Sequence, residues 1–105
     1  MDIHQLRYLM AIVESDMNVT QAARRMYLSQ SAMSKSMTAL EDEFGFPLFE
    51  RARGRLVSLS GNGMMIYERA RVIIGKIDEL LDFIEYRARS LDNSVLLGMT
   101  CSPKK

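Results

Sequence analysis

The stretch that decides the fold is NVTQAARRMYLSQSAMSKSMTALEDEFG, residues 18–45. It contains two helix starts, because Asn18 and Ser29 each precede an apolar run at helical spacing and both residue types are favoured N-caps. The second run ends at Gly45, which suits the left-handed position just past a helix, and Pro47 prevents the helix from resuming. The stretch therefore predicts a short helix, a tight turn and a longer helix.

The longer helix is expected to have two different faces. Its apolar positions recur at helical spacing, and small polar groups recur on the opposite side. The apolar residues are Met33, Met37, Leu40 and Phe44, and the polar residues are Ser31, Ser34, Lys35 and Thr38, with Gln30 in the first turn. Short polar side chains let a helix enter the major groove of DNA and bind base edges, and the N–H groups behind Ser29 can receive a phosphate.

Charge placement points to the same face of this helix. Residues 17–40 contain no Asp or Glu but include Arg24, Arg25 and Lys35, whereas residues 41–43 are all acidic. Acidic groups at the far end would repel phosphate, so the N-terminal half of the helix is expected to face DNA. The alternative is a merely solvated helix face, and the short helix before it and the arginine-rich segment after it favour DNA.

Residues 48–59 predict a β-hairpin, because two short β-like runs flank Gly54. Arg51, Arg53 and Arg55 lie on this hairpin, and an exposed basic wing suits contact with phosphates or the minor groove. Simple solubility is the alternative role for these arginines. Alternation along the strand leaves open whether Arg51 points inward.

Two further helices are expected to flank this core. The first follows Asp2, a good N-cap, and stops near Ser15. The second opens at Ser60, runs to about Arg89 and is broken by the polar residues 92–94. The apolar stripe of the first helix is Leu6, Leu9, Met10 and Val13.

The long helix carries an apolar seam of the kind that pairs helices. Its residues alternate spacings of three and four: Tyr67, Ala70, Ile74, Ile77, Leu81, Ile84, Ala88 and Leu91. A second row of Ile66, Ile73 and Leu80 widens the stripe and can pack on the helix-turn-helix. The preceding residues are too few to cover so long a stripe, so a two-fold homodimer is expected, with intramolecular packing as the alternative. Acidic residues along the helix argue against a membrane surface.

Composition excludes most other classes of function. The chain has 105 residues, is 48% hydrophobic and 26% charged, and carries a net charge of +1, so it reads as one ordinary globular domain. His4 and Cys101 are the only residues of their kinds, so neither a zinc cluster nor an internal disulfide is expected. No phosphate-binding glycine loop or nucleophile motif occurs, so no catalytic residue, metal or cofactor is expected and the protein is predicted not to be an enzyme.

The N-terminus lacks a signal-peptide pattern, and no apolar run approaches the ~20 residues of a membrane span. A cytoplasmic, nucleoid-associated location is therefore expected.

Several short stretches of the sequence, in one register, resemble the LysR-type transcriptional regulators of bacteria. The matching strings are LRY at 6–8, AA at 22–23, LSQSAMSK at 28–35, LEDEFG at 40–45, PLFER at 47–51 and LSGNG at 59–63. The resemblance implies a winged helix-turn-helix head, a linker helix that pairs two subunits, and binding to an interrupted palindrome. It also implies that Gln30, Ser31, Ser34 and Lys35 lie at the base-reading face.

The chain departs from the family pattern at three positions. Ser31 stands where the family usually has proline, and Lys35 where it often has arginine, so a donor is gained and a bidentate fork is lost. Gly61 stands where a glutamate or proline is frequent. The resemblance further implies a C-terminal effector-binding domain, whose first strand residues 95–99 resemble. Because the rest of that domain is absent, the chain is expected to be a fragment or a truncated product.

The sequence thus predicts a mainly α protein with a winged helix-turn-helix at residues 1–60, a dimerisation helix at 61–91, and a hinge and first strand at 92–105. The expected DNA-binding residues are Thr20, Arg24, Ser29, Gln30, Ser31, Ser34, Lys35, Thr38, Arg51, Arg53 and Arg55. The expected partners are double-stranded DNA and a second copy of the chain, or three copies in a tetramer of the full-length protein. A small-molecule effector is expected to bind only the absent domain.

A second reading is a protein-interaction module that draws full-length regulators into inactive mixed dimers. Both readings use the same apolar seam. They differ at Ser34 and Lys35, which only the DNA-binding reading requires.

Overall fold

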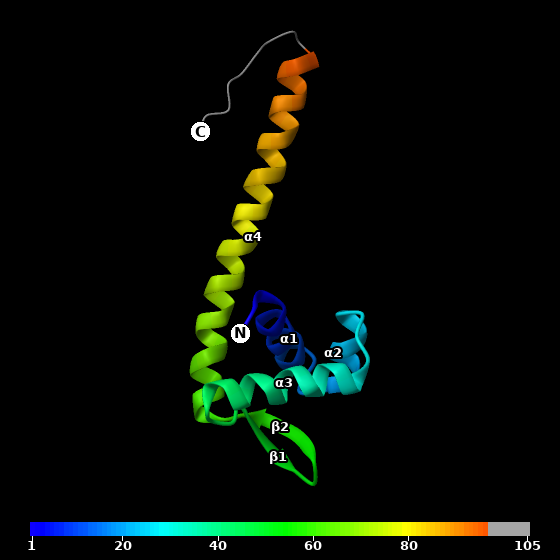
Figure 1. The fold of residues 1–105 in the computed structure, drawn as a ribbon, viewed down its shortest axis with the longest axis vertical. Coiled ribbons are helices and arrows are strands. Elements are labelled where there is room, and N and C mark those ends of the chain that lie inside the picture. The colour runs from blue at the N-terminus through cyan, green and yellow to red at the C-terminus, as the bar shows by residue number, and fades with distance from the viewer. Residues whose placement is uncertain (97–105) are drawn as a thin grey trace. The chain divides into compact units, whose positions relative to one another are not determined.

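A computed structural model describes the backbone of residues 1–96 and the side chains of residues 1–92. The elements are, in order, α1 (Ile3–Glu14), α2 (Val19–Arg25), α3 (Gln30–Phe44), β1 (Phe49–Ala52), β2 (Arg55–Leu59) and α4 (Gly61–Leu96) (Figure 1). The predicted mainly α fold with a hairpin wing is confirmed. The chain divides into two compact units, Met1–Ile74 and a second that begins at Gly75, and each is described by itself.

The three predicted N-caps are confirmed. The side chains of Asp2, Asn18 and Ser29 each accept a hydrogen bond from the backbone N–H three residues on, at 2.9, 3.0 and 3.1 Å. Such bonds satisfy donors that the first turn of a helix leaves unpaired. At the other end of α3, Gly45 has a φ of 85°, the left-handed conformation that glycine adopts most readily.

One hydrophobic core joins α1, α2 and α3 to the base of the wing. Its buried residues are Leu9, Ala11, Ile12, Ala22, Ala23, Met33, Met37, Leu40, Leu48 and Phe49. On α3 the predicted apolar face is confirmed at Met33, Met37 and Leu40, while Phe44 is half-buried. The two alanines of α2 leave room for a close approach of neighbouring helices.

The predicted stripe of α1 is partly wrong. Leu6 and Leu9 are buried as expected and Val13 packs half-buried against the core, but Met10 is only half-buried, and Ile12, which the prediction left out, is fully buried. Because α1 packs against both α2 and α3, its buried face is wider than one stripe and is shifted from the predicted one.

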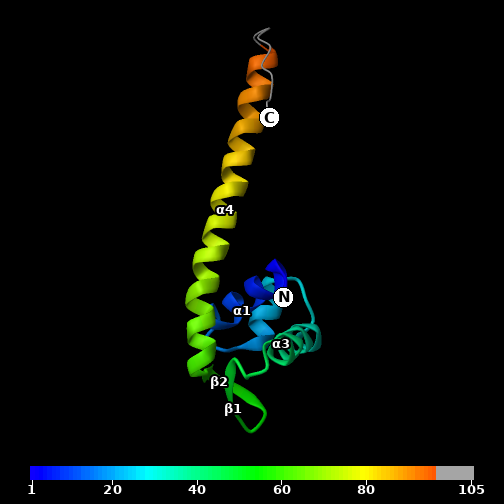
Figure 2. The same cartoon turned by 60° about the vertical axis from the view of Figure 1, so that its left-hand side comes forward.

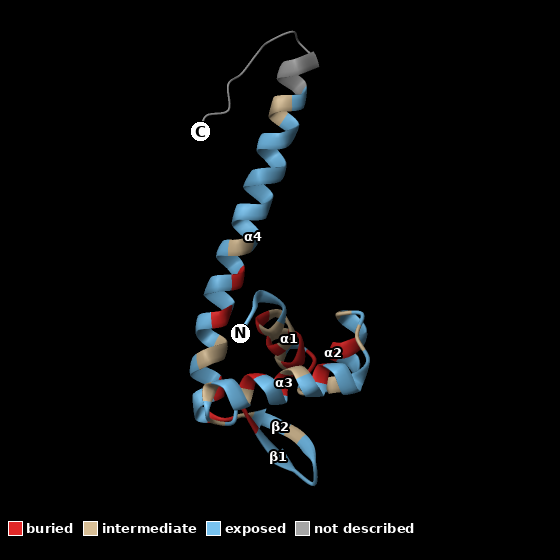
Figure 3. Cartoon of the chain, viewed as in Figure 1, coloured by how far each residue is buried: buried red, intermediate tan, exposed pale blue. Residues whose placement is uncertain are grey.

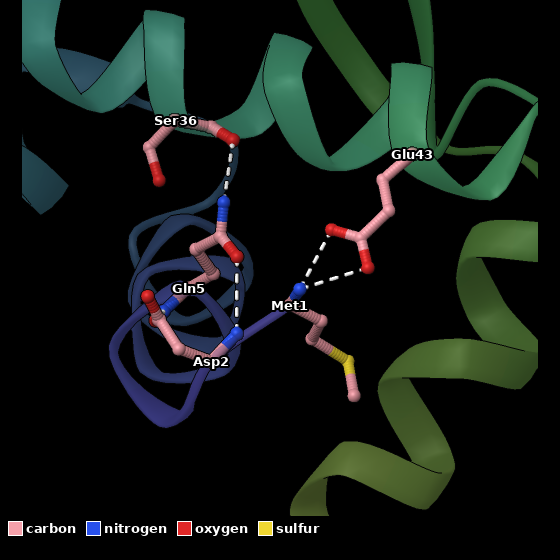
Figure 4. Close-up of polar contacts among 5 residues, drawn as sticks. All are labelled: Met1, Asp2, Gln5, Ser36 and Glu43. Carbon is pink, nitrogen blue, oxygen red and sulfur yellow. Dashed lines mark hydrogen bonds and ion pairs between the residues drawn. The ribbon is translucent and has the colours of Figure 1, made fainter.

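Polar contacts hold the start of α1 against α3 (Figure 4). The Gln5 amide nitrogen donates to the carbonyl oxygen of Ser36 at 3.4 Å, and the Gln5 amide oxygen accepts from the N–H of Asp2 at 3.1 Å. The α-amino group of Met1 donates to both carboxylate oxygens of Glu43, at 2.6 and 2.8 Å. The Gln5–Ser36 bond and the Met1–Glu43 pair thus link the start of α1 to α3, while the Asp2–Gln5 bond caps α1 itself.

The hairpin is confirmed, with β1 and β2 antiparallel and Arg53 and Gly54 as the two turn residues. Their φ angles are 54° and 76°, as the tight two-residue hairpin turn requires. The pairing shifts register between Glu50 and Arg51. In both views of the chain the hairpin lies beside the end of α3 and the start of α4 (Figures 1 and 2).

Glu41 of α3 anchors the base of this wing. One of its carboxylate oxygens accepts the backbone N–H groups of Leu48 at 2.7 Å and Phe49 at 3.3 Å. The other accepts from the Arg51 guanidinium at 3.2 Å. The sequence left open whether Arg51 points inward. In the structure its guanidinium is directed to α3, where it pairs with the Glu41 carboxylate.

Ser60 and Gly63 seat the start of α4 on residues 47 and 48. The buried Ser60 hydroxyl donates to the Pro47 carbonyl at 2.8 Å and accepts from the N–H of Gly63 at 2.9 Å. A Cβ atom on Gly63 would lie 2.0 Å from the Leu48 carbonyl oxygen. The backbones therefore approach so closely that only glycine fits.

The first part of the predicted dimer seam is packed inside the chain at Ala70 and Ile74, which corrects the prediction for these two residues, whereas an interface role of Tyr67 stays a prediction. Ala70 and Ile74 are only 2% and 3% exposed within the single chain, and Tyr67 packs half-buried against the core. Buried side chains have no surface left to offer a second subunit. Heptad spacing predicts that a stripe will be covered but does not say by which surface.

The second unit consists, over its described residues, of the rest of α4. Most of its side chains are exposed (Figure 3), including large apolar ones: Leu80, Leu81, Phe83, Ile84 and Tyr86. The helix continues to Leu96, so the predicted end near Arg89 is wrong. Asp, Asn and Ser at 92–94 disfavour a helix only weakly, and neither Gly nor Pro follows directly. The predicted strand begins with two residues that are helical, and the rest of it, 97–99, lies outside the described residues.

Candidate nucleic-acid interface

The polar face of α3 is exposed along its whole predicted length. Gln30, Ser31, Ser34, Lys35 and Thr38 are all exposed, while the residues between them on the inner side are buried. The assignment of the two faces of the helix is therefore confirmed. Exposure makes the outer face available to a ligand but does not by itself identify one.

A groove of about 750 Å³ unites this face with two other elements. Polar side chains from the start of α2, from α3 and from the wing line it: Thr20, Gln30, Ser34, Thr38, Arg51 and Arg55. Asp16 and Asn18 also line it, from the turn between α1 and α2. Residues that are far apart in the sequence thus share one concave, mainly polar surface.

The other predicted DNA-binding residues lie outside the groove lining. Four of them have exposed side chains: Arg24, Ser31, Lys35 and Arg53. The Ser29 hydroxyl accepts the Ala32 N–H as the N-cap of α3. The Ser29 and Ser31 hydroxyl oxygens lie 3.3 Å apart. These residues extend the polar surface from the start of α3 and from the tip of the wing.

The basic side chains of α2, α3 and the wing fall into two groups. Within residues 1–92, Arg24, Lys35, Arg53 and Arg55 form no ion pair, whereas Arg25 pairs with Glu14 at 3.0 Å and Arg51 pairs with Glu41 at 3.2 Å. Because an unpaired exposed cation can neutralise a phosphate without breaking an internal contact, the first group is the better suited to bind an anion.

A hydrogen bond crosses from α2 to α3 inside the groove. The Thr20 hydroxyl donates to the side-chain carbonyl oxygen of Gln30 at 3.0 Å. Sequence reasoning named both residues but missed their contact. Ten positions separate them across a turn, and no periodic pattern connects them.

Tyr27 is a surface residue that sequence reasoning missed altogether. Its side chain is 95% exposed, and its φ of 59° places it in the left-handed region, in the turn just before α3. An aromatic residue is not a typical turn residue, so the sequence carried no signal for this placement.

Among the described residues, no group of three or more His, Cys, Asp or Glu side chains is arranged to hold a metal ion. In that part of the chain no helix combines the length and the apolar character needed to cross a membrane.

Comparison with known families gives a match over most of the domain. The family described as bacterial regulatory helix-turn-helix protein, lysR family, matches residues 3–64, more than half of the chain. The HTH-type transcriptional regulator CysB of Haemophilus influenzae is 42% identical over 76 residues, which are 72% of this chain and 24% of CysB. The chain thus spans about a quarter of the length of this curated relative.

Solved structures agree with the sequence comparison. The crystal structure of a CbnR DBD–DNA complex is similar with a TM-score of 0.72 and 33% identity, covering 84% of this chain and 99% of that one. The crystal structure of the BenM DBD with catB site 1 DNA gives a TM-score of 0.76 and 30% identity, covering 84% and 97%. Both similar chains are bound to DNA in those crystals.

Proposed function

The chain belongs to the LysR family of bacterial helix-turn-helix regulators, and on this basis we propose that it binds specific double-stranded DNA sites as a homodimer on an interrupted palindrome. It is a DNA-binding domain of that family and not an enzyme. The observation that carries the proposal is the groove that joins the exposed polar face of α3 to the unpaired wing arginine Arg55. A helix lying in the major groove with a wing on the adjacent backbone needs this arrangement.

The proposed surface divides into base-reading and phosphate-binding parts. Gln30, Ser34 and Lys35 present amide, hydroxyl and ammonium groups for base edges, flanked by Ser31 and Thr38. Arg24, Arg53, Arg55 and the helix start behind Ser29 are suited to phosphates. Arg51 stays with Glu41 in this proposal and supports the wing instead of binding DNA.

The test compares one residue from each face of α3. A site is first selected from random duplex DNA with the parent chain. Gln30→Ala is expected to weaken binding to that site by about 1–3 kcal/mol per half-site, and about twice that for the dimer, with non-specific binding unchanged. Met37→Ala, which truncates a side chain that is 2% exposed, is expected to lower the free energy of unfolding by about 2–5 kcal/mol.

Binding isotherms and melting curves on both variants decide the outcome. If Gln30→Ala unfolds the domain while Met37→Ala leaves its stability unchanged, the two faces are assigned the wrong way round. If Gln30→Ala binds the selected site as tightly as the parent chain, Gln30 reads no base.

A second candidate function is an interaction module that forms mixed dimers with longer regulators. The exposed apolar side chains Leu81 and Ile84, at 53% and 51%, favour a partner helix under either function. Replacing Ser34 and Lys35 with alanine is expected to abolish site-specific DNA binding and to leave dimerisation intact. If the double variant still inhibits a longer regulator by forming mixed dimers although it no longer binds DNA, the interaction module is the function.

We place this activity on chromosomal DNA, in the nucleoid. Effector binding and tetramer formation are proposed for a longer form of the protein, because the residues that align with CysB cover only 24% of that regulator.

A further inference from the structure

The start of α2 and the start of α3 meet in the groove through one hydrogen bond. Thr20, the second residue of α2, donates its hydroxyl hydrogen to the amide oxygen of Gln30, the first residue of α3, at 3.0 Å. Both side chains are exposed and both line the groove. The bond therefore lies on the proposed reading surface and not in the core.

We propose that Thr20 is a positioning residue that holds the Gln30 amide in the orientation in which it reads adenine. The inference rests on the proposed function, namely that α3 reads bases in the major groove. It adds a determinant of specificity on α2, a helix that would otherwise supply only packing and backbone contacts.

An unrestrained glutamine is a poor reader of sequence. Its terminal torsion is broad and roughly two-fold, so the amide can present either its oxygen or its nitrogen to the same base edge. A hydroxyl can donate or accept a hydrogen bond. In the structure the Thr20 hydroxyl donates to the Gln30 oxygen at 3.0 Å, which holds the amide with its oxygen toward α2. No residue in the described part of the chain accepts a hydrogen bond from the Gln30 amide nitrogen, so both of its N–H groups remain available.

The groups that remain available match one base better than the others. The carbonyl oxygen has a second lone pair beside the free N–H groups, so the amide offers a donor next to an acceptor. Adenine presents the complementary pair in the major groove, the N7 acceptor and the N6 donor, whereas guanine presents two acceptors. An amide turned end for end would place its oxygen against N7 and lose the match.

The experiment uses a variant that removes the hydroxyl and a variant that keeps it. Thr20→Val preserves shape and β-branching without the donor, and Thr20→Ser retains the donor. Both are compared with Gln30→Ala and with the Thr20→Val/Gln30→Ala double variant. Each chain is titrated with the selected site and with duplexes carrying all four base pairs at every position of the half-site.

The expected result is a loss confined to one position of each half-site. Thr20→Val should lower the preference for A·T at that position about tenfold, which is part of what a full bidentate contact supplies. The affected position should be the one that Gln30→Ala affects. Thr20→Ser should restore the preference, and the double variant should behave like Gln30→Ala alone. Melting temperature and binding to random DNA should not change.

Three results would overturn the inference. Equal losses on selected and random duplexes, with a weaker salt dependence, would make Thr20 a phosphate ligand. Losses that add in the double variant would make the two residues independent. A Thr20→Val chain with unaltered preference at the position that Gln30→Ala affects would leave Gln30 as a reader without a positioning partner.

Failure of the proposed function itself gives a different result. If Gln30→Ala changes the preference at no position, base reading by Gln30 is wrong, and the role of Thr20 falls with it.

Discussion

At the scale of single residues, two glycines at the start of α4 differ in their tolerance of a side chain. A Cβ atom on Gly63 would meet the carbonyl oxygen of Leu48 at 2.0 Å, whereas a Cβ atom on Gly61 would meet nothing within 4 Å. Gly63→Ala is therefore expected to lower the free energy of unfolding by about 3 kcal/mol or more, because the backbones must separate. Gly61→Ala should change it by less than about 1 kcal/mol.

Denaturant unfolding of the two variants measures this difference. Equal stabilities would show that α4 can shift on residues 47–48 at no cost. The family resemblance drew attention to Gly61 as an unusual residue, but the close approach is at Gly63. Comparison with the family pattern thus identified Gly61 as a departure, whereas the packing of α4 on Leu48 shows that Gly63 is the glycine that cannot be replaced.

At the scale of elements, Glu41 joins the wing to the recognition helix α3. Its side chain is only 11% exposed and accepts hydrogen bonds from two backbone N–H groups and from Arg51. Glu41→Gln keeps one acceptor but loses the charge, so it is expected to lower the free energy of unfolding by about 1–3 kcal/mol. Glu43→Gln is the matched control on the same helix, because the Glu43 pair is exposed and worth about 0–1 kcal/mol.

Thermal melting of both variants makes the comparison. The Glu41 variant should also bind all duplexes more weakly, since a loosened wing presents Arg53 and Arg55 less well. Equal effects of the two substitutions would show that Glu41 does no more for the wing than an exposed ion pair.

The wing itself is expected to contribute affinity more than sequence choice. Arg55 forms no ion pair within residues 1–92 and lines the groove beside α3, so it is placed for a phosphate. Arg55→Ala should weaken binding to selected and random duplexes alike. The salt dependence of log K should fall by about one unit for each phosphate that is no longer neutralised. A variant that loses only discrimination, with an unchanged salt slope, would place Arg55 on a base edge instead.

At the scale of the whole molecule, the chain is expected to be a dimer through the second part of α4. Ala70 and Ile74 are buried inside the chain, so the seam available to a partner is Ile77, Leu81, Ile84 and Ala88. Replacing Ile77 and Leu81 with glutamate would bring like charges together across this seam. Sedimentation should then show monomers, which bind the selected DNA site weakly because each holds only one half-site.

The control carries the same change of charge on another part of the helix surface. Phe83→Glu with Tyr86→Glu replaces two exposed apolar residues, at 58% and 61%, that lie off the seam. This variant should remain a dimer. If the unmodified chain sediments as a monomer at high concentration, or if both double variants are monomers, the seam is wrongly identified.

The sequence by itself determined the order of the elements, the starts of the first three helices, the ends of α1 and α3, and the two faces of α3. These features depend on local chemistry. Asp2, Asn18 and Ser29 each cap a helix through a bond to a residue three positions away, and Gly45 ends α3 through its own φ angle. Periodicity within one helix likewise needs no knowledge of the neighbouring elements.

Only the tertiary structure decided which side chains meet across elements. It paired Arg51 with Glu41, bonded Thr20 to Gln30, and buried Ala70 and Ile74 within the chain. A sequence pattern shows that a charge needs a partner or that an apolar stripe needs cover. The partner itself depends on the angles at which helices cross and on where the turns direct the chain, and these arise from packing of the whole core.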